Sequence, residues 1–457
     1  MADKAVSLRG EQTVLFTNRQ LVALMWPLLL EQFLAITVGL ADSLMVATVG
    51  DAAISAVSLV DSISNLMIYI FSAMATGGAA VAGQYIGQRQ KEDACHAGQQ
   101  LIALLAAVSV FFVALLYLFR AQVLTVMFGH IEPDVMAATN TYYLYVMASI
   151  PGIALYNGGA ALWRTMGRSD ISLKVSLLMN GINVAGNAIL IFGFGMDVAG
   201  VAIPTLVSRT VAAAVILGML FNDKLTLHLS NVRAFRLDMR LMKNIFYIGV
   251  PSGVENGMFQ LGRLVLFSLI STFGTASMVA NAIGNTIANF NCFAGQAINL
   301  GLAAVVSQCV GAGEFDQARA YLKKIAKWTY GIMAAVNLTI IALLPLIMRV
   351  YNVSPEAEKL AVTVSLIHGI SSIFLWIPAF TIPSFLRAAG DAQFTMLASM
   401  TTMWLVRVLL AYVLGRYLGY GVVGVWFAHA ILDWLVRGSV FILRYRSGKW
   451  ESMGIKT

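Results

Sequence analysis

Two carboxylates lie within an apolar stretch that is long enough to cross a lipid bilayer. The stretch runs from Pro27 to Gly50 and contains Glu31 and Asp42. An ionisable group inside a membrane span costs from about 2.5 to well over 10 kcal/mol, so it usually faces a bundle interior or a wet cavity and serves transport. The separation of eleven residues is close to three helical turns, which places both acids on nearly the same helix face.

Polar residues in two later spans offer partners for Asp42. Asn183 and Asn187 are four residues apart on one helix face, and Thr205 follows Pro204, which can kink its helix and free a carbonyl. One acid, two carboxamides and a hydroxyl supply oxygen ligands for a hard cation such as Na⁺, or a network that tunes a protonatable carboxyl. The alternative is that these groups only join helices by hydrogen bonds. We predict a cation-coupling site, including the ligands of a bound Na⁺, at Asp42, Asn183, Asn187 and Thr205.

A stripe of asparagines marks another span. Asn281, Asn285 and Asn289 recur every fourth residue, so they share one helix face. Because a membrane span has no solvated surface, the stripe should face water inside the protein, or alternatively a partner helix. An earlier span has a similar stripe with Asp61 and Asn65. We predict that both stripes line a substrate cavity, together with Glu31, Glu255, Gln260, Arg263 and Arg407.

The composition explains why these polar groups must lie inside a membrane protein. Of 457 residues, 59% are hydrophobic and 11% are charged, whereas a soluble domain has about 25% charged residues. Apolar segments of about 20 residues or more, separated by short polar connections, indicate helices rather than a β-barrel. The chain is thus predicted to be an all-α membrane protein whose first span acts as its own insertion signal, with the lipid bilayer as a partner.

Twelve spans and their orientation follow from the same pattern. The spans are predicted at residues 20–48, 52–80, 97–119, 134–156, 170–193, 198–221, 245–272, 276–305, 325–348, 358–381, 393–415 and 421–443. The N-terminus, the C-terminal tail and the connections on their side hold 22 Lys and Arg, and the opposite loops hold four. This asymmetry predicts cytoplasmic termini in a cytoplasmic membrane. It also accounts for the net charge of +8 without a nucleic-acid partner.

The two halves of the chain are related at a constant offset of 224 residues. Between 27–94 and 251–318, 17 of 68 positions are identical without a gap, and the matches include Pro27 with Pro251 and Glu31 with Glu255. Six spans, an even number, separate equivalent positions, so both halves have the same orientation and are related by a pseudo-twofold axis along the membrane normal. The predicted parts are an N-terminal segment (1–19), a six-helix lobe (20–221), a cytoplasmic linker (222–244), a second six-helix lobe (245–443) and a cytoplasmic tail (444–457).

The repeat separates the two acids of the first span. Glu31 has Glu255 as its counterpart, whereas Asp42 corresponds to Leu266. Because a specialised site is expected where the symmetry is broken, Asp42 is the acid that we predict to couple a cation. Glu31 is interpreted as a feature that both lobes share.

These residues resemble the multidrug and toxic compound extrusion (MATE) family over essentially the whole chain. The resemblance rests on Pro27 followed by Asp42 and Met45-Val-Ala47, on Val81-Ala-Gly-Gln-Tyr-Ile-Gly87, on Arg164-Thr-Met-Gly167, on the segment from Asn183 to Gly193 and on Arg387-Ala-Ala-Gly390. It implies two six-helix lobes in a V-shaped pair that exports organic, often cationic, compounds in exchange for Na⁺ or H⁺. By position, Asp42 matches the acid of the family's first helix, and Asn183, Asn187 and Thr205 match the residues around it.

Two positions depart from the family pattern. Some members have Asp where this chain has Asn187, and members with a second-lobe site place an acid where this chain has Phe259. These departures leave the choice between H⁺ and Na⁺ open. We expect a monomeric antiporter with no other cofactor. The alternative is a flippase for a lipid-linked or anionic envelope precursor, which Arg263, Arg407 and Arg437 would suit. An enzyme is not expected, because the sequence has neither a His-Glu-x-x-His nor a Gly-x-Ser-x-Gly motif.

Overall fold

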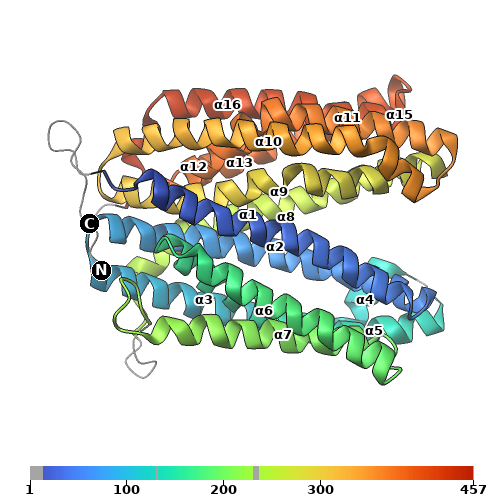
Figure 1. Cartoon of the computed structure of the whole chain (residues 1–457), viewed down its shortest axis with the longest axis horizontal. Helices are drawn as coiled ribbons and strands as arrows, with labels where there is room; N and C mark the ends of the chain where they lie inside the picture. Colours follow the sequence, from blue (N-terminus) through green and yellow to red (C-terminus); the bar gives the residue numbers. More distant parts are fainter. Residues whose placement is uncertain (1–13, 130–131, 230–235, 456–457) are drawn as a thin grey trace. The chain divides into compact units, whose positions relative to one another are not determined.

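Long helices account for nearly all of the chain that the structure describes. The computed structural model describes residues 14–129, 132–229 and 236–455, and within these ranges it contains helices and turns but no strand. Each of the twelve predicted spans coincides with one long helix or with helical segments that follow one another directly (Figure 1). The predicted all-α architecture is therefore confirmed.

The first half of the chain forms the helices that surround Asp42. A glycine with φ 135°, Gly50, separates the first two helices, and Gly167, with φ 77°, lies between α5 and α6; such positive φ values favour glycine. A wide π-helical turn, Ile189–Gly193, extends α6. The helices are α1 (Asn18–Ala47), α2 (Asp51–Gly87), α3 (Lys91–Leu118), the short α4 (Arg120–Phe128), α5 (Pro133–Thr165), α6 (Ser169–Ala188) and α7 (Ala199–Gly218).

The second half repeats the pattern but interrupts its last three long helices with wide turns. These π-helical turns are Ile377–Thr381, Met403–Val408, Val413–Tyr417 and Ala428–Asp433. A π turn inserts an extra residue into the helical ladder and re-aims the side chains around it. The helices are α8 (Met239–Ser271), α9 (Thr275–Gly311), α10 (Phe315–Tyr351), α11 (Pro355–Trp376), α12 (Ile382–Ala388), α13 (Ala392–Thr402), α14 (Leu409–Tyr412), α15 (Gly421–Phe427) and α16 (Trp434–Arg446).

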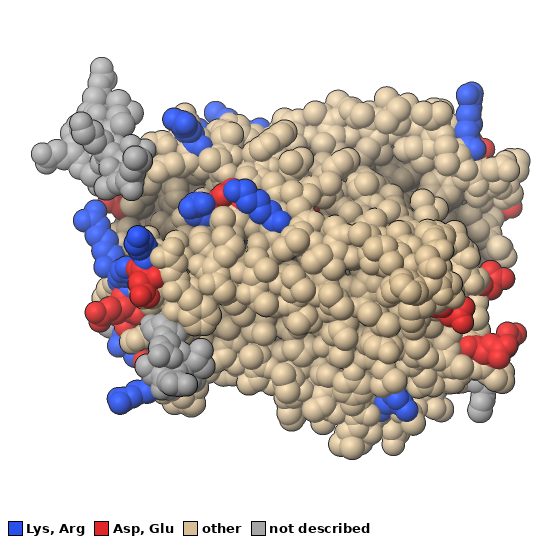
Figure 2. Space-filling view, turned by 60° about the horizontal axis from the view of Figure 1, so that its bottom comes forward, with Lys and Arg blue, Asp and Glu red and all other residues tan. Residues whose placement is uncertain are grey.

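The surface fits a bilayer environment. Among the described residues, ten continuous helices are long and apolar enough to cross a membrane by length and composition. The other two predicted spans correspond to α5 and α8, which have 33 residues each and include more polar positions. On the face drawn in Figure 2, charged side chains gather toward the two ends of the helices and leave the surface between almost bare of charge. The chain is a multi-pass membrane protein.

The helices group into two compact units. The first turns of α1 belong to the unit of the second half of the chain, and the first turns of α8 belong to the unit of the first half. One unit is Trp26–Gly253, and the other is Val254–Thr457 with Met1–Met25, of which residues 14–25 are described. The divisions fall inside α1 and α8, within three residues of Pro27 and Pro251, where a missing backbone N–H interrupts the helical hydrogen bonds.

Contacts inside each unit explain this grouping. Just before α1, the backbone N–H of Phe16 donates to the Tyr321 hydroxyl of α10 at 2.8 Å. At the start of α8, a methyl group added to Gly77 of α2 would lie 3.0 Å from the Cα of Gly249. The predicted lobe and linker bounds stay predictions, and residues 1–13, 230–235 and 456–457 of these segments lie outside the described chain.

Candidate functional site

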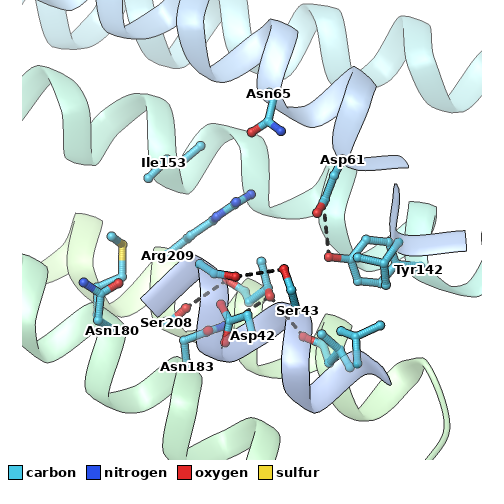
Figure 3. Close-up of a pocket in the computed structure, with 16 residues that line it drawn as sticks. Asp42, Ser43, Asp61, Asn65, Tyr142, Ile153, Asn180, Asn183, Ser208 and Arg209 are labelled. Atoms are coloured by element: carbon cyan, nitrogen blue, oxygen red, sulfur yellow. Dashed lines mark hydrogen bonds between the residues drawn. The ribbon is translucent and has the colours of Figure 1, made fainter. Parts of the chain in front are cut away.

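A polar cavity of about 250 Å³ lies inside the unit Trp26–Gly253 (Figure 3). Its walls come from α1, α2, α5, α6 and α7, and the two acids Asp42 and Asp61 line it from different helices. The predicted cation-coupling residues Asn183 and Thr205 and the predicted substrate residue Asn65 also line it. The structure thus places members of both predicted groups in one cavity.

Asp42 stands at the centre of a hydrogen-bond network that joins three helices. The Nδ2 group of Asn187 donates to Asp42 Oδ1 at 3.0 Å. In the amide orientation that satisfies every partner, Asn183 Nδ2 donates to Asp42 Oδ1 at 3.1 Å and to Oδ2 at 2.9 Å. The oxygen of the same amide then accepts from Thr205 Oγ1 at 3.2 Å. The four residues predicted around the cation are therefore connected.

Local packing sets the geometry of this network. Asn183 and Asn187 lie one turn apart on α6, and Gly186 lies between them. A methyl group added to Gly186 would lie only 2.7 Å from Cβ of Pro204, the residue before Thr205 in α7. Because a side chain would occupy space that the proline fills, glycine lets α7 approach α6 closely enough for Asn183 to contact Thr205.

The second acid of the cavity has its own partners. The Tyr142 hydroxyl of α5 donates to Asp61 Oδ1 at 3.2 Å. Arg209 of α7 donates from Nη1 to Ser149 Oγ at 2.8 Å. Among the described residues, none of the ion pairs within 4.0 Å joins Arg209 to a carboxylate, yet its charge acts electrostatically on both Asp42 and Asp61.

Two of the residues that define this cavity were not predicted as site residues. Tyr142 carries no sequence signal, because tyrosine is common in membrane helices. Arg209 is visible as a charge in a span, but its neighbours depend on how α5 packs on α7. A methyl group added to Gly152 of α5 would lie 3.1 Å from the backbone of Arg209, so this approach also requires glycine.

Glu31 and Glu255, which are equivalent in the repeat, do not line this cavity, and each is buried in a different unit. Glu31 is 7% exposed and accepts hydrogen bonds from Ser172 Oγ at 2.7 Å and from the Tyr156 hydroxyl at 3.3 Å. Glu255 is 5% exposed, binds Arg387 Nη1 at 3.1 Å and accepts from Ser399 Oγ at 2.7 Å. Both acids tie the first helix of a half to helices that follow much later in the chain.

The remaining predicted cavity residues belong to the other unit. Asn281 is buried and accepts from Trp426 Nε1 at 3.2 Å, while Asn285 Nδ2 donates to the Asn281 carbonyl at 2.9 Å. Arg407 is buried and pairs with an acid described below. Along the stripe the exposure increases from Asn281 to Asn289; Gln260 is half-buried and Arg263 is exposed. The substrate role predicted for these residues stays a prediction.

A family model matches both halves of the chain. The MatE model matches residues 27–189 and again residues 251–413, which together make up more than half of the sequence. The two matches begin 224 positions apart (251 − 27). This is the offset predicted from the sequence, so the internal duplication is confirmed.

Individual relatives are similar along their whole length. The chain is 29% identical to the uncharacterized transporter YisQ of Bacillus subtilis, over 95% of each chain. It is 23% identical to the probable multidrug resistance protein NorM of Thermotoga maritima, over 96% of this chain and 94% of that protein. A mutant of the Vibrio cholerae MATE transporter VcmN has the same fold, with a TM-score of 0.86 at 20% identity over 95% of this chain and 98% of that one.

These matches agree with the helices and the duplication described above. Members of the family move small molecules across membranes and are not enzymes, as the sequence predicts. The chain belongs to the MatE family of multidrug and toxic compound extrusion transporters.

Proposed function

We propose that this protein exports organic, cationic or amphiphilic compounds in exchange for H⁺ or Na⁺, and that Asp42 binds the coupling cation. The observation that carries the proposal is the Asp42 network inside a cavity that also reaches two further helices, α2 and α5. A carboxylate held by amide donors is a suitable ligand for a small cation or a proton. The proposed setting is a cytoplasmic membrane with both termini in the cytoplasm, which the distribution of Lys and Arg supports.

The network provides a way for one cation to affect three helices. A charged Asp42 accepts two hydrogen bonds from the amide nitrogen of Asn183. A protonated Asp42 can instead donate to the amide oxygen, which requires the amide to turn. The Asn183 nitrogen then donates to Thr205 Oγ1 at 3.2 Å, and Thr205 donates to the Val201 carbonyl at 3.0 Å. Neutralising Asp42 in α1 thus changes hydrogen bonds in α6 and α7.

The exchange of substrate for the coupling cation follows from their competition for the same carboxylates. A cationic substrate and the coupling cation both gain from the carboxylates of this unit, so binding of one disfavours binding of the other. By linkage, the effect of the coupling cation on substrate affinity equals the effect of the substrate on cation affinity. If the cation binds better when the cavity opens outward, its inward gradient expels the substrate.

The test is transport in everted membrane vesicles. We expect Asp42→Asn to abolish gradient-driven substrate uptake while protein yield and melting temperature change little, because Asn has nearly the same shape but cannot carry the charge. Asp51→Asn is the matched control, because Asp51 is an exposed acid at the start of α2. Uptake by the Asp42→Asn protein at the wild-type rate would disprove the proposal.

Export of an anionic or lipid-linked precursor is the second candidate. It requires arginines that are free to bind an anion. Arg407 does not meet this requirement, because it already holds Asp433. A drug-susceptibility panel compared with a lipid-precursor assay separates the two candidates.

A further inference from the structure

Three wide helical turns of the unit that contains Val254–Thr457 bring charged and aromatic residues together. Phe380 lies in the turn Ile377–Thr381, Arg407 in Met403–Val408 and Asp433 in Ala428–Asp433. The last two turns pack against each other, and α16 packs against the first. Because π-helical turns are rare and often occur at functional sites, three such turns in one cluster indicate a candidate functional site.

Arg407 and Asp433 form a buried ion pair within the cluster, in which Asp433 Oδ1 accepts no hydrogen bond. Both side chains are buried, with exposed fractions of 4% and 0%. Arg407 donates from Nε at 3.1 Å and from Nη2 at 2.6 Å, and both bonds go to Asp433 Oδ2. The charge of Asp433 also acts electrostatically on Arg437, which follows four residues later in the chain.

Arg437 is the unpaired cation of the cluster. It is 1% exposed, and among the described residues it has neither a hydrogen-bond acceptor nor an ion-pair partner; its Nε and Nη2 are buried without one. Its guanidinium lies 4.3 Å from the ring centre of Phe380 and 5.0 Å from that of Phe259. Aromatic rings attract the cation but accept few of its N–H bonds, so the hydrogen-bonding need remains.

The unsatisfied donors have the geometry of a carboxylate clamp. Nε and Nη2 point from the same edge of a guanidinium group, and their two N–H bonds are parallel. A carboxylate can accept both with its two oxygens, which is the side-on form of bidentate recognition. Arg407 uses the equivalent pair of donors to hold Asp433. The free edge of Arg437 therefore matches an organic carboxylate better than a spherical ion.

The repeat shows that the acids of the Asp42 cavity have no acidic counterparts in the other unit. Within the ungapped part of the repeat, Asp61 corresponds to Asn285, because 61 + 224 = 285. Asp42 corresponds to Leu266. Both acids of the Asp42 cavity are therefore replaced by uncharged residues in the other unit, where Arg407 and Arg437 are buried.

We propose that Arg437 binds the carboxylate group of an organic anion or zwitterion through Nε and Nη2. The indole N–H group of Trp434, also buried without an acceptor, offers a further donor in the same aromatic cluster. The proposal rests on the transport function above for the role of the site in substrate choice, and it extends the proposed substrates from cationic compounds to compounds that carry a carboxylate. Its binding test does not depend on transport.

The test measures thermal stability of the purified full-length protein with choline salts at constant ionic strength. We expect benzoate to raise the melting temperature saturably, by about 2 to 4 °C, because a ligand that prefers the native state stabilises it. Benzamide, which has the same ring without the charge, should have no effect. Arg437→Lys should weaken benzoate binding at least about tenfold because lysine keeps the charge but lacks the fork, and Arg437→Gln should abolish it.

Controls make each outcome decisive. Arg416→Gln, which removes an exposed arginine of the same unit, should respond as the wild type does. An equal benzoate response in Arg437→Gln, no response in the wild type, or the same saturable response to chloride would each overturn the proposal. If Arg437→Gln does not fold, Arg437→Lys and the benzoate, benzamide and chloride comparison in the wild type decide.

The Asp42→Asn variant distinguishes the carboxylate site from the proposed transport function. Asp42→Asn should lose gradient-driven transport but keep the benzoate response, because the two residues lie in different units. Loss of transport with an intact benzoate response supports both proposals. Intact transport in Asp42→Asn would reject the coupling role and leave the carboxylate site standing.

Discussion

Arg209 places a fixed positive charge in the cavity that contains Asp42 and Asp61. With both acids ionised, the three groups carry a net charge of −1, so one monovalent cation is enough to neutralise the cavity. Arg209 donates a hydrogen bond to Ser149 rather than to either acid. Its charge therefore acts on both acids. The arginine thus limits how many coupling cations the cavity accepts.

The opposing effects of Arg209 and Asp61 can be tested by neutralising each charge alone and both together. We expect Arg209→Gln to increase the apparent affinity for the coupling cation about tenfold, because Coulomb's law gives about 1.7 kcal/mol for two unit charges at an assumed separation on the order of 10 Å and an effective dielectric constant of about 20. Asp61→Asn should lower the affinity, and the double variant should return near the wild-type value. Cation-dependent substrate release in vesicles measures these affinities, and an unchanged or lowered affinity in Arg209→Gln would contradict the idea.

At the scale of the element, the approach of α6 and α7 determines the Asp42 network. Gly186 leaves room for Pro204, and this contact places Thr205 beside Asn183. The helices themselves and the four network residues could be predicted, because apolar runs identify spans and the broken repeat identifies Asp42. The contacts of Tyr142 and Arg209 could not, because they depend on how α5 packs with α2 and α7.

The second unit shows the same limit of sequence reasoning. The wide turns that carry Arg407 and Asp433 have no recognisable signature in this chain. Their pairing was therefore not predictable, although both charges are visible in the spans. The pairing of Glu255 with Arg387 also arises from packing between helices that are distant in sequence.

A change at Gly186 tests the helix approach. We expect Gly186→Val to lower the free energy of unfolding by about 1 to 3 kcal/mol, because an added methyl group would lie 2.7 Å from Pro204 and overpack the contact. Transport should fall with it, since Thr205 moves away from Asn183. Gly181→Ala is the control on the same helix, because a methyl group there meets nothing within 4 Å. Denaturation and vesicle transport measure both effects; equal behaviour of the two variants would refute the packing argument.

At the scale of the whole molecule, the proposed orientation can be tested by labelling. The native cysteines Cys95, Cys292 and Cys309 are buried, so a membrane-impermeant maleimide should leave them unmodified. In intact cells we expect Arg416→Cys to be labelled and Arg168→Cys to be protected, because the positive-inside distribution places the first outside and the second inside. Everted vesicles should give the reverse pattern. The opposite result would place the termini outside.

The exchange of helix ends between the two units has a consequence for synthesis on the ribosome. The residues just before and at the start of α1 bind Tyr321 and Lys324, so they must wait for their partners until more than three hundred residues have been added. The unit Trp26–Gly253 likewise remains incomplete until the first turns of α8 emerge. Two polypeptides produced by a break between α7 and α8 would therefore not be self-sufficient modules, because each would lack turns that the other one carries.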